Sequence, residues 1–406
     1  MCAATEQSLP VLQEEPTVVV PRRFARFPRA VGPNLSEALN GRRNSLGILR
    51  LILASAVIFC HAWPIGGWGE DPLAARFEYQ ENLGGVAVLG FFAISGYLIT
   101  KSGMTGDALR FLWHRILRIM PAFWGVLVVC AFVIGPIWWA ANGRGLDTYF
   151  TSGAGGPLGY LTGNWDLTIR QYGIHDVFGN NPYGAVAGSV MNGSIWTLRY
   201  EFFAYLIVCG LVLFALLTTV RIVVPMITAL LFVLNLAVLV AGEAAFAVLP
   251  FFEDRFFIGL TLIFMIGATF AVYSKQIPLH DGLACLAAVV FVVSLFKGGL
   301  GIVGYPAFAY ILLYLAARLP QKVQRVGATN DYSYGIYLYG WPVQQVLAAF
   351  GLYTWGYLPF SLLALAGATA FAWLSWHGLE KRALGIKDIG PGRGARYWWR
   401  KVTRRG

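Results

Sequence analysis

The chain has 406 residues, of which 57% are hydrophobic and 13% are charged, and its mean hydropathy is positive. This composition excludes a set of soluble domains and predicts an all-α bundle that crosses a membrane several times. The net charge of +11 is accounted for by basic segments that contact anionic lipid headgroups, so no nucleic-acid partner is expected.

Apolar runs long enough to span a bilayer recur from residue 46 to residue 376, since the hydrocarbon core takes about 20 helical residues. About ten such spans place both termini on one side of the membrane. That side holds 25 of the 31 Lys and Arg residues, so the positive-inside rule predicts cytoplasmic termini. The predicted spans lie at 46–63, 84–101, 121–141, 194–217, 222–241, 255–273, 283–296, 305–317, 332–350 and 355–376.

Three regions are expected: a disordered basic cytoplasmic tail at 1–44, a transmembrane domain at 45–380 and a basic cytoplasmic tail at 381–406. The first 45 residues contain no apolar core of the signal-peptide type, so the first span is expected to be uncleaved. Four of the five Cys residues fall inside predicted spans. We therefore expect no disulfide framework and no metal site.

The first predicted span, LGILRLILASAVIFCHAW, carries Arg50 and His61. Eleven residues make about three helical turns, so both side chains leave one face and lie roughly 16 Å apart along the axis. An ionisable group facing lipid costs about 2.5–3.5 kcal/mol or more, so this face is expected to line a shared polar cavity. In the alternative, Arg50 snorkels to the headgroups and His61 ends the helix at the other interface.

Small residues fill the second span, 84–100, and predict close packing against the first span. Arg115 and Arg118 then lie on one face of a helical turn, directly before Pro121, which is expected to open the third span. Paired guanidinium groups at a cytoplasmic mouth suit a phosphate-bearing ligand. Without other evidence, an ordinary positive-inside anchor is the favoured alternative.

The long outer connection at 142–193 is expected to help cover an acceptor site. The next span begins SIWTLRYEFFAYL and places Glu201 on a polar stripe about 10 Å below the outer surface. His61 ends in the same outer part of the membrane, so the carboxylate and the imidazole are expected at one depth, close enough to meet. The alternative is a structural ion pair of Glu201 with Arg199 or Arg255.

The ninth predicted span carries a second polar stripe, made of Ser333, Tyr337, Gly340 and Gln344. Gly340 is expected to leave a gap where a side chain would otherwise enter the cavity. The fifth to eighth spans have few polar residues and are interpreted as scaffold. The basic, Trp-bearing segment 397–405 is expected to lie on the inner leaflet.

Together these stretches resemble the acyltransferase 3 family, bacterial integral membrane proteins that transfer acyl groups to hydroxyls of glycans and other acceptors. The resemblance spans residues 46–382. The chain departs from the family at Gly340, where members often have His, and its first 45 residues are unmatched. The matching pieces are LRLILASAVIFCH, GGVAVLGFFAISGYLIT, Arg115 and Arg118 before Pro121, SIWTLRYEFFAYL, YSYGIYLYGWP and Glu380-Lys381-Arg382.

The resemblance implies that His61 is the essential catalytic residue and that Glu201 has a functional role. It also implies that Arg50, Arg115 and Arg118 engage the acyl donor, usually cytosolic acetyl-CoA. In our hypothesis His61 accepts the proton of the acceptor hydroxyl and Glu201 orients the imidazole. A covalent acyl-histidine intermediate is the open alternative.

The resulting hypothesis is O-acyl transfer, most often of acetyl, in the bacterial inner membrane. The acceptor is a cell-surface or lipid-linked glycan, such as O-antigen or exopolysaccharide, and no cofactor is bound permanently. A transporter or flippase is the rival function, because intramembrane Arg, His and Glu also mark substrate paths. The paired halves that many transporters show are not found in this sequence.

Overall fold

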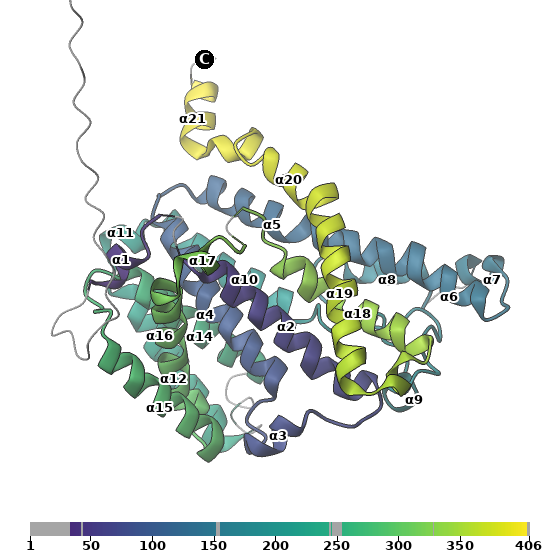
Figure 1. Cartoon of the computed structure of the whole chain (residues 1–406). Helices are drawn as coiled ribbons and strands as arrows, with labels where there is room; N and C mark the ends of the chain where they lie inside the picture. The colour runs from purple at the N-terminus through teal and green to yellow at the C-terminus, as the bar shows by residue number, and fades with distance from the viewer. Residues whose placement is uncertain are drawn as a thin grey trace, which may run out of the picture.

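The computed structural model describes residues 33–41, 44–151, 155–242, 245, 254–327 and 329–403. Throughout these ranges the chain forms helices joined by turns and loops, with no β-strand. The long helices pack side by side, and the short helices α3 (Pro72–Arg76) and α9 (Gly184–Ala187) lie at the end of the bundle opposite α21 (Ala395–Thr403) (Figure 1). The all-α class is therefore confirmed.

Seven helices within the described residues are long and apolar enough to cross a membrane. The three remaining predicted spans each coincide with a helix of 17 residues. A helix therefore occurs at every predicted position, whereas the total of ten spans and the cytoplasmic termini stay predictions.

The long helices follow the predicted order along the chain. Two of them contain a π-helical turn, and a third is preceded by one. Their bounds are α2 (Leu46–Ile65), α4 (Leu83–Gly103), α5 (Ala108–Val129) with α6 (Gly135–Ala141), α10 (Thr197–Leu213), α12 (Val223–Ala241), α14 (Arg255–Val272), α15 (Asp281–Lys297), α16 (Tyr305–Arg318), α18 (Ser333–Ala349) and α19 (Tyr357–Ser375) with α20 (Lys381–Gly385). Short helices in the connections are α1 (Leu35–Ala38), α7 (Leu146–Thr151), α8 (Pro157–Asn164), α11 (Leu216–Thr219) and α17 (Gln321–Gln324).

The third long helix begins earlier than predicted. Asp107 caps α5 by accepting a hydrogen bond from the backbone N–H of Arg110, and Pro121 lies inside the helix rather than at its start. Membrane helices tolerate an internal proline because neighbouring groups satisfy the freed carbonyl. Arg115 and Arg118 therefore belong to the body of α5, and not to a turn that precedes it.

The described part of the N-terminal region is ordered, so the prediction of a disordered tail is wrong for residues 33–41. Asn34 and Glu37 form a capping box around α1. Leu35 is fully buried, and its backbone N–H donates to the carbonyl of Ile277. Burial of two leucines, Leu35 and Leu39, anchors this segment to the bundle. Residues 1–32, 42 and 43 lie outside the described residues.

The C-terminal region, described over residues 381–403, contains the helices α20 and α21 with a turn and a short 3₁₀ helix between them. α20 continues α19 through the π-helical turn Trp376–Glu380. Asp107 accepts a hydrogen bond from the backbone N–H of Ala395, and Arg110 pairs with Asp388 at 2.8 Å. These contacts attach the segment before α21 to the start of α5. Contact of segment 397–405 with the inner leaflet stays a prediction.

Glycines allow α4 to approach α2, as its small residues predicted, and also α14, which was not predicted. A Cβ atom on Gly90 would lie 2.9 Å from Leu53 Cδ1 of α2. A Cβ on Gly96 would lie 1.9 Å from the carbonyl oxygen of Phe264, and one on Gly267 would lie 2.2 Å from that of Ala93. Backbone oxygens cannot rotate away, so the contact between α4 and α14 requires glycine on both helices.

Gly340 has a different role from the one predicted. A Cβ at this position would lie 2.9 Å from Ile58 Cγ1, so Gly340 brings α18 against α2 and does not open a gap into a cavity. The neighbouring Gln344 donates to the backbone carbonyl of Ile58 at 2.8 Å. The contact fixes α2 one turn before His61.

We expect Gly96→Ala and Gly267→Ala each to destabilise the protein by about 1–3 kcal/mol, because an added methyl group must force two backbones apart. Gly210→Ala is the matched control, since a Cβ there meets no atom within 4 Å. Thermal unfolding of purified protein in detergent measures the difference. Equal melting temperatures for Gly96→Ala and Gly210→Ala would contradict the packing argument.

Candidate active site

Polar side chains line two separate cavities instead of the single cavity expected along the first span. The inner cavity, of about 540 Å³, is formed by α2, α4, α5, α10 and α18. The outer cavity, of about 1450 Å³, is formed by the end of α2, residues 70–82, α12, α14 and Tyr305. Arg50 lines the inner cavity and His61 lines the outer one. Helix α2 therefore contributes one predicted functional side chain to each.

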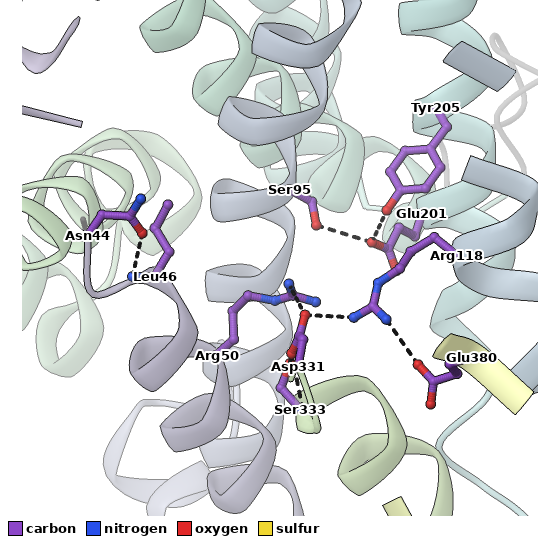
Figure 2. A network of polar contacts seen from close by, with 10 residues as sticks. All are labelled: Asn44, Leu46, Arg50, Ser95, Arg118, Glu201, Tyr205, Asp331, Ser333 and Glu380. Atoms are coloured by element: carbon purple, nitrogen blue, oxygen red, sulfur yellow. Dashed lines mark hydrogen bonds and ion pairs between the residues drawn. The ribbon is translucent and has the colours of Figure 1, made fainter. Parts of the chain in front are cut away.

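Arg50 and Arg118 share the carboxylate of Asp331 in the inner cavity region (Figure 2). Asp331 Oδ2 lies 2.5 Å from Arg50 Nη1 and 2.6 Å from Arg118 Nη2, and Oδ1 accepts two hydrogen bonds from Ser333. Arg118 Nη1 also lies 3.0 Å from Glu380 Oε2. Burial raises the pKa of Asp331, but the two guanidinium groups outweigh burial and bring the pKa down to about 2. Asp331 is thus ionised at neutral pH.

Asp331 and Glu380 are the site residues that sequence reasoning missed. A signal for both was available, because an acid at the predicted cytoplasmic end of a span stands where the positive-inside rule leads one to expect bases. Each is separated from its arginine by more than 200 residues in the chain. Only the tertiary structure shows that these acids neutralise Arg50 and Arg118.

Arg115 differs from the other two arginines. Its guanidinium lies 5.9 Å from the ring centroid of Phe111, and its buried Nε has no hydrogen-bond partner. Within the described part of the chain Arg115 makes no ion pair. Arg115 does not line the inner cavity. An arginine side chain without an ion pair is nevertheless suited to an anionic ligand.

Glu201 lines the inner cavity, where Figure 2 shows its carboxylate directed toward Ser95 and Tyr205. Glu201 Oε1 accepts hydrogen bonds from Ser95 Oγ at 3.1 Å and from Tyr205 Oη at 2.5 Å. The prediction that Glu201 meets His61 is therefore wrong. The alternative ion pair with Arg199 or Arg255 is not formed either within the described residues, where Glu201 bonds to Ser95 and Tyr205 and Arg255 lines the outer cavity.

The position of Glu201 follows from a non-helical segment that enters the bundle before α10 begins. The side chain of Asn192 donates to the backbone carbonyl of Leu338, in the middle of α18. Tyr337 Oη donates to the carbonyl of Ser194 at 2.5 Å. Irregular backbone is tolerated at membrane depth when protein groups satisfy it in this way. α10 starts inside the bundle, so Glu201 lies deeper than a helix starting at Ser194 would place it.

The half-buried His61 reaches the outer cavity with its ring fixed from one side. Its ring packs edge-on against Trp341 with 4.9 Å between centroids, and Trp341 in turn packs against Tyr183 at 5.0 Å. Through Trp341 this aromatic layer connects the imidazole to Tyr183 of the outer connection 142–193. The connection 142–193 therefore contacts Trp341 and does not line the outer cavity that it was expected to cover. Residues 70–82 line this cavity instead.

The outer cavity has an acidic lining. Glu70, Asp71 and Glu81 line it together with a single basic residue, Arg255. Burial raises the pKa of Glu81 to about 7, against the opposing attraction of Arg255. The cavity beside His61 is thus poor in positive charge, whereas arginines dominate the inner one.

Comparison with known proteins agrees with this arrangement. The acyltransferase 3 model, described as an acyltransferase domain, matches residues 43–377. The chain is 29% identical to an O-acetyl transferase of Shigella phage Sf6 over 355 residues, which make up 84% of this chain and 96% of that protein. It is 32% identical to nodulation protein 10 of Rhizobium leguminosarum bv. viciae over 183 residues, 43% of this chain and 46% of the relative. No solved structure gives a significant match.

The polar cavities thus belong to a multi-pass membrane O-acyltransferase. The chain belongs to the acyltransferase 3 family. Family membership shows that the protein is an enzyme, and it favours an acyltransferase over the rival function of a transporter or flippase.

We expect Arg118→Ala to lower the free energy of unfolding by about 3–5 kcal/mol, because it leaves Glu380, which is 2% exposed, as an uncompensated buried charge. Arg110→Ala is the control on the same helix, and its exposed pair with Asp388 is worth at most about 1 kcal/mol. Urea or thermal unfolding in detergent compares the variants. Equal losses of unfolding free energy in the two variants would show that the ion pairs of Arg118 do not hold the helices together.

Proposed function

We propose that this enzyme transfers an acetyl group from cytosolic acetyl-CoA to a hydroxyl of a cell-surface or lipid-linked glycan in the bacterial inner membrane. The observation that carries the proposal is the division of α2 between an arginine-lined inner cavity and an outer cavity that contains His61. The name of the phage relative, an O-acetyl transferase, supports acetyl as the transferred group. The roughly 16 Å between Arg50 and His61 along the helix suits the extended thioester arm of coenzyme A.

In this proposal the arginines have two different roles. Arg115 has no ion pair within the described residues and supplies the main phosphate contact. Arg50 and Arg118 are already neutralised by Asp331, so they define the cavity and hold α2, α5 and α18 in register. Glu201 belongs to this donor side, where Ser95 and Tyr205 fix its carboxylate.

His61 is the proposed general base. Its imidazole removes the proton from the acceptor hydroxyl as the oxygen attacks the thioester carbonyl carbon. The carbon–sulfur bond then breaks, the imidazolium returns the proton to the leaving thiolate, and an O-acetyl ester and free CoA result. Trp341 limits rotation of the ring, and general-base catalysis of this type contributes about 10²–10⁴ in rate.

The donor assignment is tested with Arg115→Ala in reconstituted protein. The lost phosphate contact is made in the ground state and in the transition state alike, so KM for acetyl-CoA should rise severalfold with little change in kcat. Arg110→Ala, on the exposed side of the same helix, should leave KM unchanged. An unaltered donor KM in Arg115→Ala would return this residue to the role of a membrane anchor.

The catalytic assignment is tested with His61→Ala and His61→Gln. Both should lose transfer by at least about 10²-fold, since neither alanine nor an amide takes up a proton at neutral pH. His114→Gln is the matched control, because His114 lies on α5 against the carbonyl of Lys387. NMR of the surface polysaccharide and release of CoA provide two readouts. Acetylation near the wild-type level in well-folded His61→Ala protein would exclude His61 as the base.

A further inference from the structure

A short segment on the rim of the outer cavity, Tyr79–Gln80–Glu81, is held in place by its central residue. Gln80 Nε2 donates to the backbone carbonyls of Phe77, Ser294 and Leu295. Gln80 Oε1 accepts from the backbone N–H of Leu300. These bonds attach the loop to the end of α15 and to the π-helical turn that follows. The two flanking side chains, Tyr79 and Glu81, are thereby presented to the cavity on a rigid support.

Tyr79 combines exposure with a strained backbone. Its side chain is 74% exposed, although it lines the cavity. Its φ is +55° and that of Glu78 is +53°, a left-handed conformation that is unfavourable for non-glycine residues. Such strain persists only where the surroundings impose it. The loop therefore maintains an aromatic ring at the cavity rim that does not serve the protein core.

Glu81 is the acid of this cavity that is available to a ligand. The two oxygens of Asp71 are occupied by the backbone N–H groups of Leu73 and Leu83, so Asp71 is structural. Glu81 is approached by the charge of Arg255, which does not offset its burial. With Glu70 on the same lining, the cavity carries more negative than positive charge.

We propose that Tyr79 and Glu81 select the acceptor sugar. This inference rests on the proposed function, because it assigns the outer cavity to the acceptor. The ring of Tyr79 covers the apolar face of a pyranose, as amphipathic aromatic side chains do in binding sites, and the Glu81 carboxylate accepts a hydrogen bond from a ring hydroxyl. The negative lining favours neutral and amino sugars and disfavours uronic acids.

Three sugars on one frame test the selection: methyl glucoside, methyl glucosaminide and methyl glucuronide. Their binding to the full-length protein in nanodiscs is measured by saturation-transfer NMR, which needs no turnover. At pH 8, where Glu81 with its pKa of about 7 is mostly ionised, we expect the glucuronide to bind about tenfold more weakly than the glucoside because of the like charge several ångströms away. Glu81→Gln should reduce this discrimination severalfold. Tyr79→Ala should weaken the binding of all three sugars to the same extent.

Glu78→Gln is the matched control, because Glu78 is exposed, lies on the same loop and does not line the cavity. It should behave as the wild type. Equal binding of glucuronide and glucoside, no binding of any of the three, or equal effects of Glu81→Gln and Glu78→Gln would overturn the inference. CoA release from acetyl-CoA separates this result from the proposed function: sugar discrimination without transfer refutes the reaction, and transfer without discrimination refutes only the selection.

Discussion

The architecture depends on one carboxylate held between two arginines. Burying a guanidinium group is costly unless an anion compensates it, and Asp331 compensates both Arg50 and Arg118. Because the three residues come from α2, α5 and the start of α18, the ion pairs fix these helices at one end. Glu380 extends the same network to the end of α19. The inner cavity owes its shape to this network.

Along α2 the two cavities differ in charge as well as in position. Arginines line the inner cavity, and the outer cavity is lined mainly by acids. The acidic lining of the outer cavity disfavours an anionic ligand there, so the proposed donor would enter from the side of Arg50. Gly340 and Trp341 hold the middle and the end of α2 against α18, which keeps His61 at a constant depth beside the outer cavity.

Amide side chains organise the irregular segments that shape both cavities. Gln80 satisfies backbone groups of the loop after α3, and Asn192 does the same for the segment before α10. In each case one side chain replaces the hydrogen bonds that a helix would have supplied. The non-helical chain can then lie inside the bundle, where it determines the positions of Glu81 and Glu201.

The sequence by itself determined the class of the protein and the positions of its helices. Hydrophobic length is a local property, so a helix occurs at each predicted span, and the small residues of α4 indicated its close packing. Partners distant in the chain were not determined in this way. The ion pairs of Asp331 and Glu380, the placement of Glu201 and the contact of Gly340 with Ile58 join segments more than 100 residues apart. They depend on how tilted helices and irregular segments fit together, and only the tertiary structure decided them.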